Sequence, residues 1–213
     1  MLGPRETFVA ELWGAQTSST SIFDGGRRPG APHAIYDGPA IGTENQMGRI
    51  VVTEFVSLDG VVEDPGGSED FRHGGWSFEF NRGEDGDKFK LDEALESQAL
   101  LLGRVTYEGF AAAWPSRQGA FADRFNTMPK YVVSSTLEEA EWNNSTVLKG
   151  NVVEEVSTLR QRTDGDIVVH GSARLVQTLL EHDLVDELRL MVFPIVLGSG
   201  KRLFGHTTDK KLL

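Results

Sequence analysis

The chain has 213 residues, a formal net charge of −11 and no cysteine. The lack of cysteine excludes disulfides, thiolate catalysis and cysteine-bound metals, and the acidic balance argues against a general nucleic-acid surface. A local basic pocket can still bind a phosphorylated ligand on an acidic protein. No run of the sequence is long and apolar enough to cross a bilayer, so we expect a cytoplasmic protein that binds neither nucleic acid nor membrane.

The first 46 residues differ from the rest of the chain. Residues 25–32 are rich in glycine and proline, residues 17–21 are all serine or threonine, and no regular hydrophobic period persists. This composition predicts a poorly ordered N-terminal extension over residues 1–46. A regular pattern begins abruptly at Met47, which we expect to be the natural start of the protein. Residues 47–213 are then expected to form one domain.

From Arg49 onward, β-rich apolar runs alternate with amphipathic segments. This alternation predicts an α/β fold with a mostly parallel central sheet and helices on both faces. A long loop over 63–86, rich in glycine, proline and charge, is expected to be functional. The predicted strands are 50–56, 100–102, 131–134, 167–169 and 188–193. The predicted helices are 87–97, 105–113, 152–160 and 174–181.

Two strand-to-helix corners carry most of the functional information. At the first, a buried run ends in Gly103-Arg104, and Thr106 lies in the helix that follows. A helix N-terminus offers partial positive charge and free N–H groups, and an arginine adds a guanidinium fork, so this corner suits a phosphate. At the second corner, Gly171 permits close backbone approach, and Ser172 is expected to cap the next helix and to bond an anion.

Each corner taken alone is an ordinary turn. Two such corners at the carboxyl ends of parallel strands indicate one extended ligand with several phosphates, because ligands of open α/β sheets bind outside those ends. Other motifs are missing: there is no G-x-G-x-x-G and no G-x-S-x-G. Residues 198–202 resemble only part of a P-loop. The five histidines lack metal-ligand spacing, so we expect no metal site and assign His170 to packing.

From about Arg49 to Phe204 the chain resembles the dihydrofolate reductase-like superfamily. It is most similar to the branch that includes the reductase domain of bacterial riboflavin biosynthesis. The resemblance rests on the order and spacing of several segments. They are 57–60, 102–108, 130–135, 171–172 with 179–180, 184–188 and 194–204.

The resemblance implies NADPH as hydride donor and a small heterocycle as substrate, either pterin-like or similar to 5-amino-6-(5-phosphoribosylamino)uracil. It places Arg104 and Thr106 at cofactor phosphates, with the arginine favouring NADPH over NADH. It places Ser134 and Ser135 near the adenosine, and the four residues from Gly171 to Arg174 around the pyrophosphate. The full implied cofactor site is Gly103, Arg104, Thr106, Ser134, Ser135, Gly171, Ser172, Ala173 and Arg174.

The proton donor is less sharply defined. Asp87 fits the carboxylate that dihydrofolate reductases carry on their first helix, although a helix-start aspartate also complements the helix dipole. Asp59, in an Asp-Gly turn, is the second candidate. Four aromatic residues are candidates for substrate contact. Trp76 and Phe78 lie in the glycine-rich loop, where they could instead fix the loop, and Phe110 with Trp114 follow the Gly-Arg-x-Thr segment, where core packing is the alternative.

Two departures from the family pattern bear on function. The chain stops at Leu213, where the family domain continues into further strands, so we expect an exposed edge at the last strand and a homodimer. His170-Gly171-Ser172 stands where many reductases have paired glycines. The sequence therefore supports two hypotheses: an NADPH-dependent reductase, or a non-catalytic nucleotide-binding or interaction module that retains the fold.

Overall fold

The computed structural model describes residues 47–205 and Lys210. The expectations for residues 1–46 lie outside this part of the chain. Within residues 47–205, no helix is long and apolar enough to span a membrane.

The core of the fold is a sheet of six strands, and every neighbouring pair is parallel, which confirms the predicted α/β class. The strand order is β4-β3-β2-β5-β1-β6. The strands are β1 (Arg49–Ser57), β2 (Ala99–Gly103), β3 (Lys130–Val133), β4 (Ser145–Leu148), β5 (Asp166–His170) and β6 (Glu187–Phe193).

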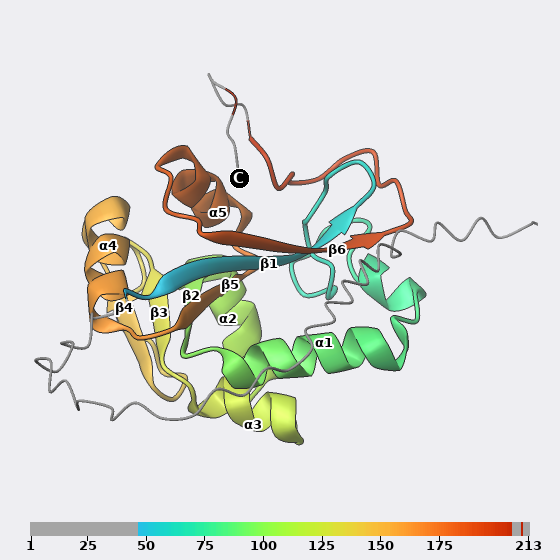
Figure 1. Ribbon diagram of the computed structural model, residues 1–213. Coiled ribbons are helices and arrows are strands. Elements are labelled where there is room, and N and C mark those ends of the chain that lie inside the picture. The colour runs from blue at the N-terminus through green and yellow to red at the C-terminus, as the bar shows by residue number, and fades with distance from the viewer. Residues whose placement is uncertain (1–46, 206–209, 211–213) are drawn as a thin grey trace, which may run out of the picture. The chain divides into compact units, whose positions relative to one another are not determined.

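Helices cover both faces of this sheet (Figure 1). They are α1 (Gly83–Glu96), α2 (Arg104–Ala113), α3 (Ala120–Thr127), α4 (Val152–Arg162) and α5 (Ala173–Glu181), with a short 3-10 turn, η1, at Trp76–Glu79. Side chains alternate along each strand. Ile50 and Val52 of β1 therefore pack in the cluster that holds α4 and α5, and Val51 packs in the cluster that holds α1, α2 and α3.

Three elements differ from the sequence-based expectation. β4 and α3 were not predicted: β4 is a short, half-exposed edge strand, and the short α3 buries only Ala122 and Phe125. Their apolar patterns are therefore too weak to stand out. α1 begins at Gly83 rather than at Asp87: its first four residues are two glycines and two acids, which carry no apolar signal. The expected long loop 63–86 is thereby shortened at its C-terminal end and interrupted by η1.

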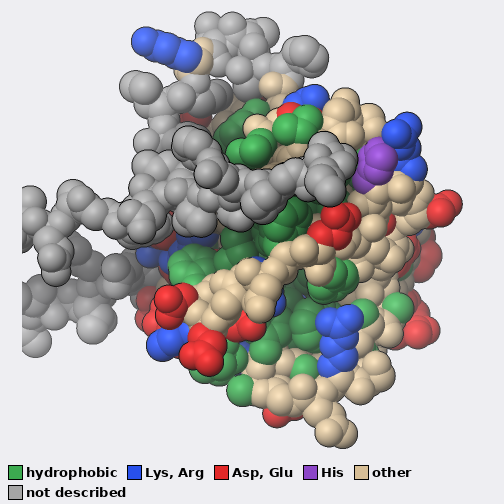
Figure 2. Space-filling view, turned by 90° about the vertical axis from the view of Figure 1, so that its right-hand side faces the viewer, with side chains coloured by type: hydrophobic (Ala, Val, Ile, Leu, Met, Phe, Trp, Pro, Cys, Tyr) green, Lys and Arg blue, Asp and Glu red, His purple; other side chains and the backbone are tan. Residues whose placement is uncertain are grey.

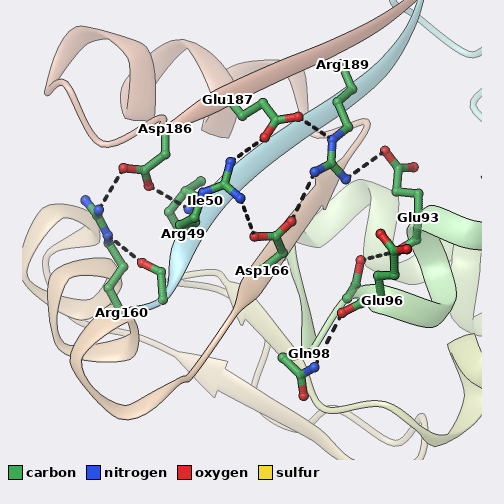
Figure 3. A network of polar contacts seen from close by, with 12 residues as sticks. Arg49, Ile50, Glu93, Glu96, Gln98, Arg160, Asp166, Asp186, Glu187 and Arg189 are labelled. Carbon is green, nitrogen blue, oxygen red and sulfur yellow. Dashed lines mark hydrogen bonds and ion pairs between the residues drawn. The ribbon is translucent and has the colours of Figure 1, made fainter. Parts of the chain in front are cut away.

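An ion-pair network joins the amino ends of three strands to α1 (Figure 3). Arg49 of β1 bonds Asp166 of β5 at 3.1 Å and also pairs with Glu187 of β6. Arg189 contacts Asp166 at 3.1 Å, Glu187 at 2.6 Å and Glu93 of α1 at 3.7 Å. The network fixes β1, β5 and β6 in register at their amino ends. The two strand-to-helix corners lie at the opposite, carboxyl ends of the strands.

The strand β6 ends the sheet formed by residues 47–205, as the sequence predicts. Val192 exposes 57% of its surface and Leu190 exposes 38%. An exposed apolar edge strand is a template for pairing with another chain. The homodimer stays a prediction.

A buried lysine anchors β3 beside the edge strand β4. Lys130 is fully buried, and its Nζ donates to the carbonyl oxygens of Met128 (2.8 Å), Asn143 (2.8 Å) and Asn126 (3.2 Å). The ammonium also lies 4.3 Å from the centre of the Trp142 ring. Burial lowers the pKa of Lys130 to about 8. The ammonium thus ties the end of α3 and the start of β4 to β3.

Replacing this lysine should destabilise the fold. We expect Lys130→Met to lower the free energy of unfolding by about 2–4 kcal/mol, because buried carbonyls lose their donor. The matched control Lys149→Met removes an exposed ion pair with Glu138 and should cost less than about 1 kcal/mol. Chemical denaturation of the three proteins measures the difference. Equal losses in the two variants would show that Lys130 has no anchoring role.

Candidate functional site

A cavity of about 1050 Å³ lies where the strands end, and it receives residues from β1, β2, β5, α1, α2 and α5. Figure 2 views the molecule toward this edge and shows hydrophobic side chains exposed among polar loops. The size suits a ligand as large as a dinucleotide.

Both strand-to-helix corners open into this one cavity. Gly103 ends β2 and Arg104 follows it, and Gly171 and Ser172 follow β5; all four line the cavity. The corners lie side by side because β2 and β5 are neighbours in the sheet. The expectation that two separated corners share one cleft is therefore confirmed.

Hydrogen bonds from Ser172 hold the two corners together, and we call this arrangement the Ser172 clasp. The Gly103 N–H donates to Ser172 Oγ at 2.9 Å, and the Ser172 N–H donates to Thr106 Oγ1 at 2.9 Å. Ser172 Oγ in turn donates to the His170 carbonyl at 3.1 Å. The clasp spans nearly seventy residues of sequence and fixes the start of α2 against the start of α5.

The clasp corrects one expectation about Ser172. This residue occupies the N-cap position of α5, but its side chain makes no capping hydrogen bond and bonds Gly103 instead. Gly103, at the N-cap of α2, has no side chain to cap its helix. The first N–H groups of both helices are thus left without side-chain caps beside the cavity. Such groups form a site for anions.

The backbone at the second corner is left-handed. Gly171 has φ +56°, and Ser172 has φ +60°. A Cβ added at Gly171 would lie 3.1 Å from both Thr106 Cγ2 and Oγ1. Glycine avoids this tight contact and adopts the left-handed backbone without strain, so it favours the close approach of the two corners.

The remaining predicted cofactor residues divide into two groups. Arg104, Thr106, Ala173 and Arg174 line the cavity with the clasp, and Arg104 forms an exposed pair with Glu108 at 2.9 Å. Ser134 and Ser135 are not among the lining residues. Ser134 Oγ instead accepts the N–H groups of Thr136 and Leu137 and so shapes the turn after β3.

The predicted aromatic residues also divide. Phe110 and Trp114 line the cavity while packing against the cluster on the α1–α3 face. Trp76 does not line it: the indole is fully buried, donates to the Glu63 carbonyl at 2.8 Å and meets Phe193 edge-on. Phe78, two residues later, is 75% exposed and reaches the cavity. Trp76 thus fixes the loop, and Phe78 is its cavity residue.

The two predicted carboxylates occupy different environments. Asp87 on α1 lines the cavity, is 64% exposed at its side chain and bonds Arg82 at 2.7 Å. Asp59 is not a lining residue. A hydrogen bond from Ser57, with others from the N–H groups of Leu197 and Gly198, lowers the pKa of Asp59 to about 2. Asp59 therefore serves as an acceptor that ties two loops together.

Glu54 was not identified from the sequence; it is the buried acid of the cavity with an unpaired oxygen. Glu54 lies on β1, is 3% exposed and lines the cavity, and its Oε1 has no hydrogen-bond partner. Burial raises its pKa well above the usual value, and the charge of Lys90 opposes this. A single ionisable residue inside the apolar run 50–56 was the available signal.

Two further titratable groups enclose the same region. Lys90 of α1 is buried, donates to Thr53 Oγ1 at 2.7 Å and pairs with Glu93; burial lowers its pKa. His170 packs edge-on against Phe125, and burial together with the Lys90 charge lowers its pKa well below the usual value. His170 is therefore a neutral packing residue that lines the cavity, in line with its expected role.

These features fit a phosphorylated dinucleotide. The two helix starts without side-chain caps and the glycine cradle suit a pyrophosphate, and Arg104 and Arg174 supply positive charge at either side of the clasp. The buried Glu54 carboxyl leaves one oxygen for a ligand. The residues present therefore fit the nicotinamide cofactor that the family resemblance implies.

The fold of this chain is dihydrofolate reductase-like. One solved neighbour is a candidate riboflavin biosynthesis protein from Shewanella sp. PV-4, with a TM-score of 0.60, 23% identity and coverage of 76% of this chain and 86% of that chain. Another is dihydrofolate reductase from Enterococcus faecalis, solved with NADP(H), with a TM-score of 0.50, 18% identity and coverage of 76% and 80%.

The chain belongs to the RibD C-terminal domain family, which matches residues 49–213. Two relatives come from Bacillus subtilis (strain 168). Protein YyaP is 30% identical over 161 residues, which cover 73% of this chain and 80% of YyaP. Protein YwjB is 31% identical over 158 residues, which cover 74% of this chain and 83% of YwjB. Neither relative's name carries an activity.

The neutral state of His170 predicts a pH dependence of stability. Below about pH 6.5 the unfolded chain binds a proton at this histidine and the folded protein does not. The free energy of unfolding should therefore fall between pH 7 and pH 5 by up to about 2 kcal/mol more than it falls in His170→Gln. Denaturation at several pH values measures both slopes. Parallel slopes would contradict the assignment.

Proposed function

We propose that the protein is an NADPH-dependent reductase of a small heterocycle, either pterin-like or similar to 5-amino-6-(5-phosphoribosylamino)uracil. The observation that carries the proposal is the Ser172 clasp, which brings two helix starts without side-chain caps to one cavity. Family membership supports a reductase fold and leaves the substrate open.

The residues of the clasp would bind the phosphates of the cofactor. Gly171 to Arg174 would bind the pyrophosphate through backbone N–H groups and the start of α5. Arg104, at the start of α2, would bind the 2′-phosphate, because a guanidinium fork favours the extra dianion. When bound, the reduced nicotinamide supplies a hydride, and the chain must orient the substrate and supply a proton.

The substrate would enter beside α1 and α2. Asp87 and Leu91 of α1 line this part of the cavity, together with Phe110 and Trp114. Aromatic rings suit a flat heterocycle. Asp87 is the exposed carboxylate here, and we propose that it carries the proton to the substrate through water.

Turnover is tested by mixing the protein and NADPH with pterins and with aminopyrimidine ribosides. Loss of nicotinamide absorbance that depends on one of these compounds supports the reductase. Tight NADPH binding without turnover across the panel would support the non-catalytic nucleotide-binding module instead.

The role of Arg104 is tested by cofactor binding alone. We expect Arg104→Ala to raise the Kd for NADPH about tenfold or more, because a charge-assisted contact to the 2′-phosphate is lost. The Kd for NADH should change by less than about threefold, since NADH lacks that phosphate. Fluorescence of the bound dihydronicotinamide measures both constants.

Arg162→Ala is the matched control, because Arg162 is exposed at the end of α4 and is not a lining residue. It should leave both constants unchanged. Equal losses of NADPH and NADH affinity in Arg104→Ala would contradict the proposal that Arg104 binds the 2′-phosphate.

A further inference from the structure

We propose that Glu54 contacts the nicotinamide ring, and that its carboxyl group releases a proton when the bound ring is oxidised. The inference rests on the proposed function and adds a residue that binds one redox state of the cofactor differently from the other. It is carried by the order of the strands, the enclosure of Glu54 and the charges around it.

The strand order sets the direction of the cofactor across the sheet. β2, β5 and β1 are consecutive neighbours, about 4.8 Å apart. Arg104 follows β2, the Gly171–Arg174 turn follows β5, and Glu54 lies on β1. With the 2′-phosphate end at Arg104 and the pyrophosphate at β5, the nicotinamide end is directed toward β1. Glu54 is the ionisable cavity residue of that strand.

The register places Glu54 directly beside the pyrophosphate turn. Thr53 of β1 pairs with His170, so Glu54 stands next to Gly171. Burial raises the pKa of Glu54, and the Gly171 backbone opposes this shift. Glu54 alternates with Thr53 and thus shares the face of Val52 and Val56, which α5 covers. Lys90 and Asp87 belong to α1, on the other face of the sheet. Glu54 therefore lies on the side of the cavity where we place the cofactor, and Asp87 lies on the side formed by α1.

The Glu54 carboxyl keeps one oxygen unpaired inside the protein. Its Oε1 is buried without a hydrogen-bond partner, and the residue is 3% exposed. A buried, unpaired acid is held neutral, because ionisation would place an uncompensated charge at low dielectric. A neutral carboxyl is compatible with the uncharged reduced ring.

The oxidised ring changes this balance, since it carries a positive charge. A cation brought to a buried carboxyl favours the ionised form. The Oε–H bond then breaks, its electron pair stays on the carboxylate, and the proton passes to water. The hydride lost by the ring goes to the heterocyclic substrate of the proposed reaction, so no other oxidant is needed. Among the neighbouring charges, Lys90 favours ionisation of the Glu54 carboxyl and Glu69 opposes it. The other charged or titratable residues that line the cavity are Glu63, Asp64, Arg82, Asp87, Arg104, Arg117, His170, Arg174 and Lys201.

The test is calorimetric binding of NADP⁺ and of NADPH near pH 7 in two buffers that differ in ionisation enthalpy. The difference between buffers gives the protons released on binding. The 2′-phosphate is common to both cofactors, so its protonation cancels in the comparison. We expect NADP⁺ to release about one proton more than NADPH.

The variant Glu54→Gln keeps the shape and neutrality of the acid and cannot ionise. We expect it to abolish the difference in proton release and to weaken NADP⁺ about tenfold or more relative to NADPH. Glu84→Gln is the matched control: Glu84 is exposed in the first turn of α1 and is not a lining residue. It should behave as the wild type.

The outcomes separate this inference from the function on which it rests. If both cofactors bind to the wild type with the same proton release, the inference is wrong and the reductase proposal stands. The same holds if Glu54→Gln retains the difference. If neither cofactor binds, the proposed function fails and the inference fails with it. The wild-type measurement decides even if the variant does not fold.

Discussion

The functional site depends on a few hydrogen bonds made by one serine. Ser172 accepts the Gly103 N–H and donates its own N–H to Thr106, so two turns that lie far apart in sequence become one wall of a cavity. Because its side chain is used in this way, Ser172 leaves the start of α5 uncapped. The same contact that assembles the cavity therefore also leaves N–H groups for a ligand.

Polar groups are paired at the amino ends of the strands and partly unpaired at the carboxyl ends. At the amino edge, Arg49 and Arg189 are paired with several carboxylates, which fixes β1, β5 and β6 (Figure 3). At the carboxyl edge, two helices begin without side-chain caps, and Glu54 keeps an unpaired oxygen. The ion pairs at the amino ends make that part of the sheet rigid. This rigidity can hold the unpaired polar groups at the carboxyl ends in place for a ligand to bind. Glu93 joins the two regions, since it contacts both Arg189 and Lys90.

The sequence predicted the parallel sheet and both corners because those features are local. An apolar run that ends in Gly103-Arg104 or Gly171-Ser172 predicts a buried strand, a turn and the start of a helix. It did not predict β4 and α3, whose apolar faces are short, or the bond from Gly103 to Ser172, which depends on tertiary packing. It could not separate Trp76 from Phe78, because spacing does not tell which aromatic of a loop is buried. Glu54 was visible as a lone acid in an apolar strand, but its burial requires the neighbouring strand and α5.

The central claim is that a reduced nicotinamide dinucleotide lies across the ends of β2, β5 and β1. A crystal structure of the protein with NADPH tests it most directly. The account predicts the 2′-phosphate at Arg104, the pyrophosphate on the backbone of Gly171 to Arg174, and the nicotinamide beside Glu54. A cofactor bound elsewhere, or in the reverse direction with its adenosine over β1, would contradict it.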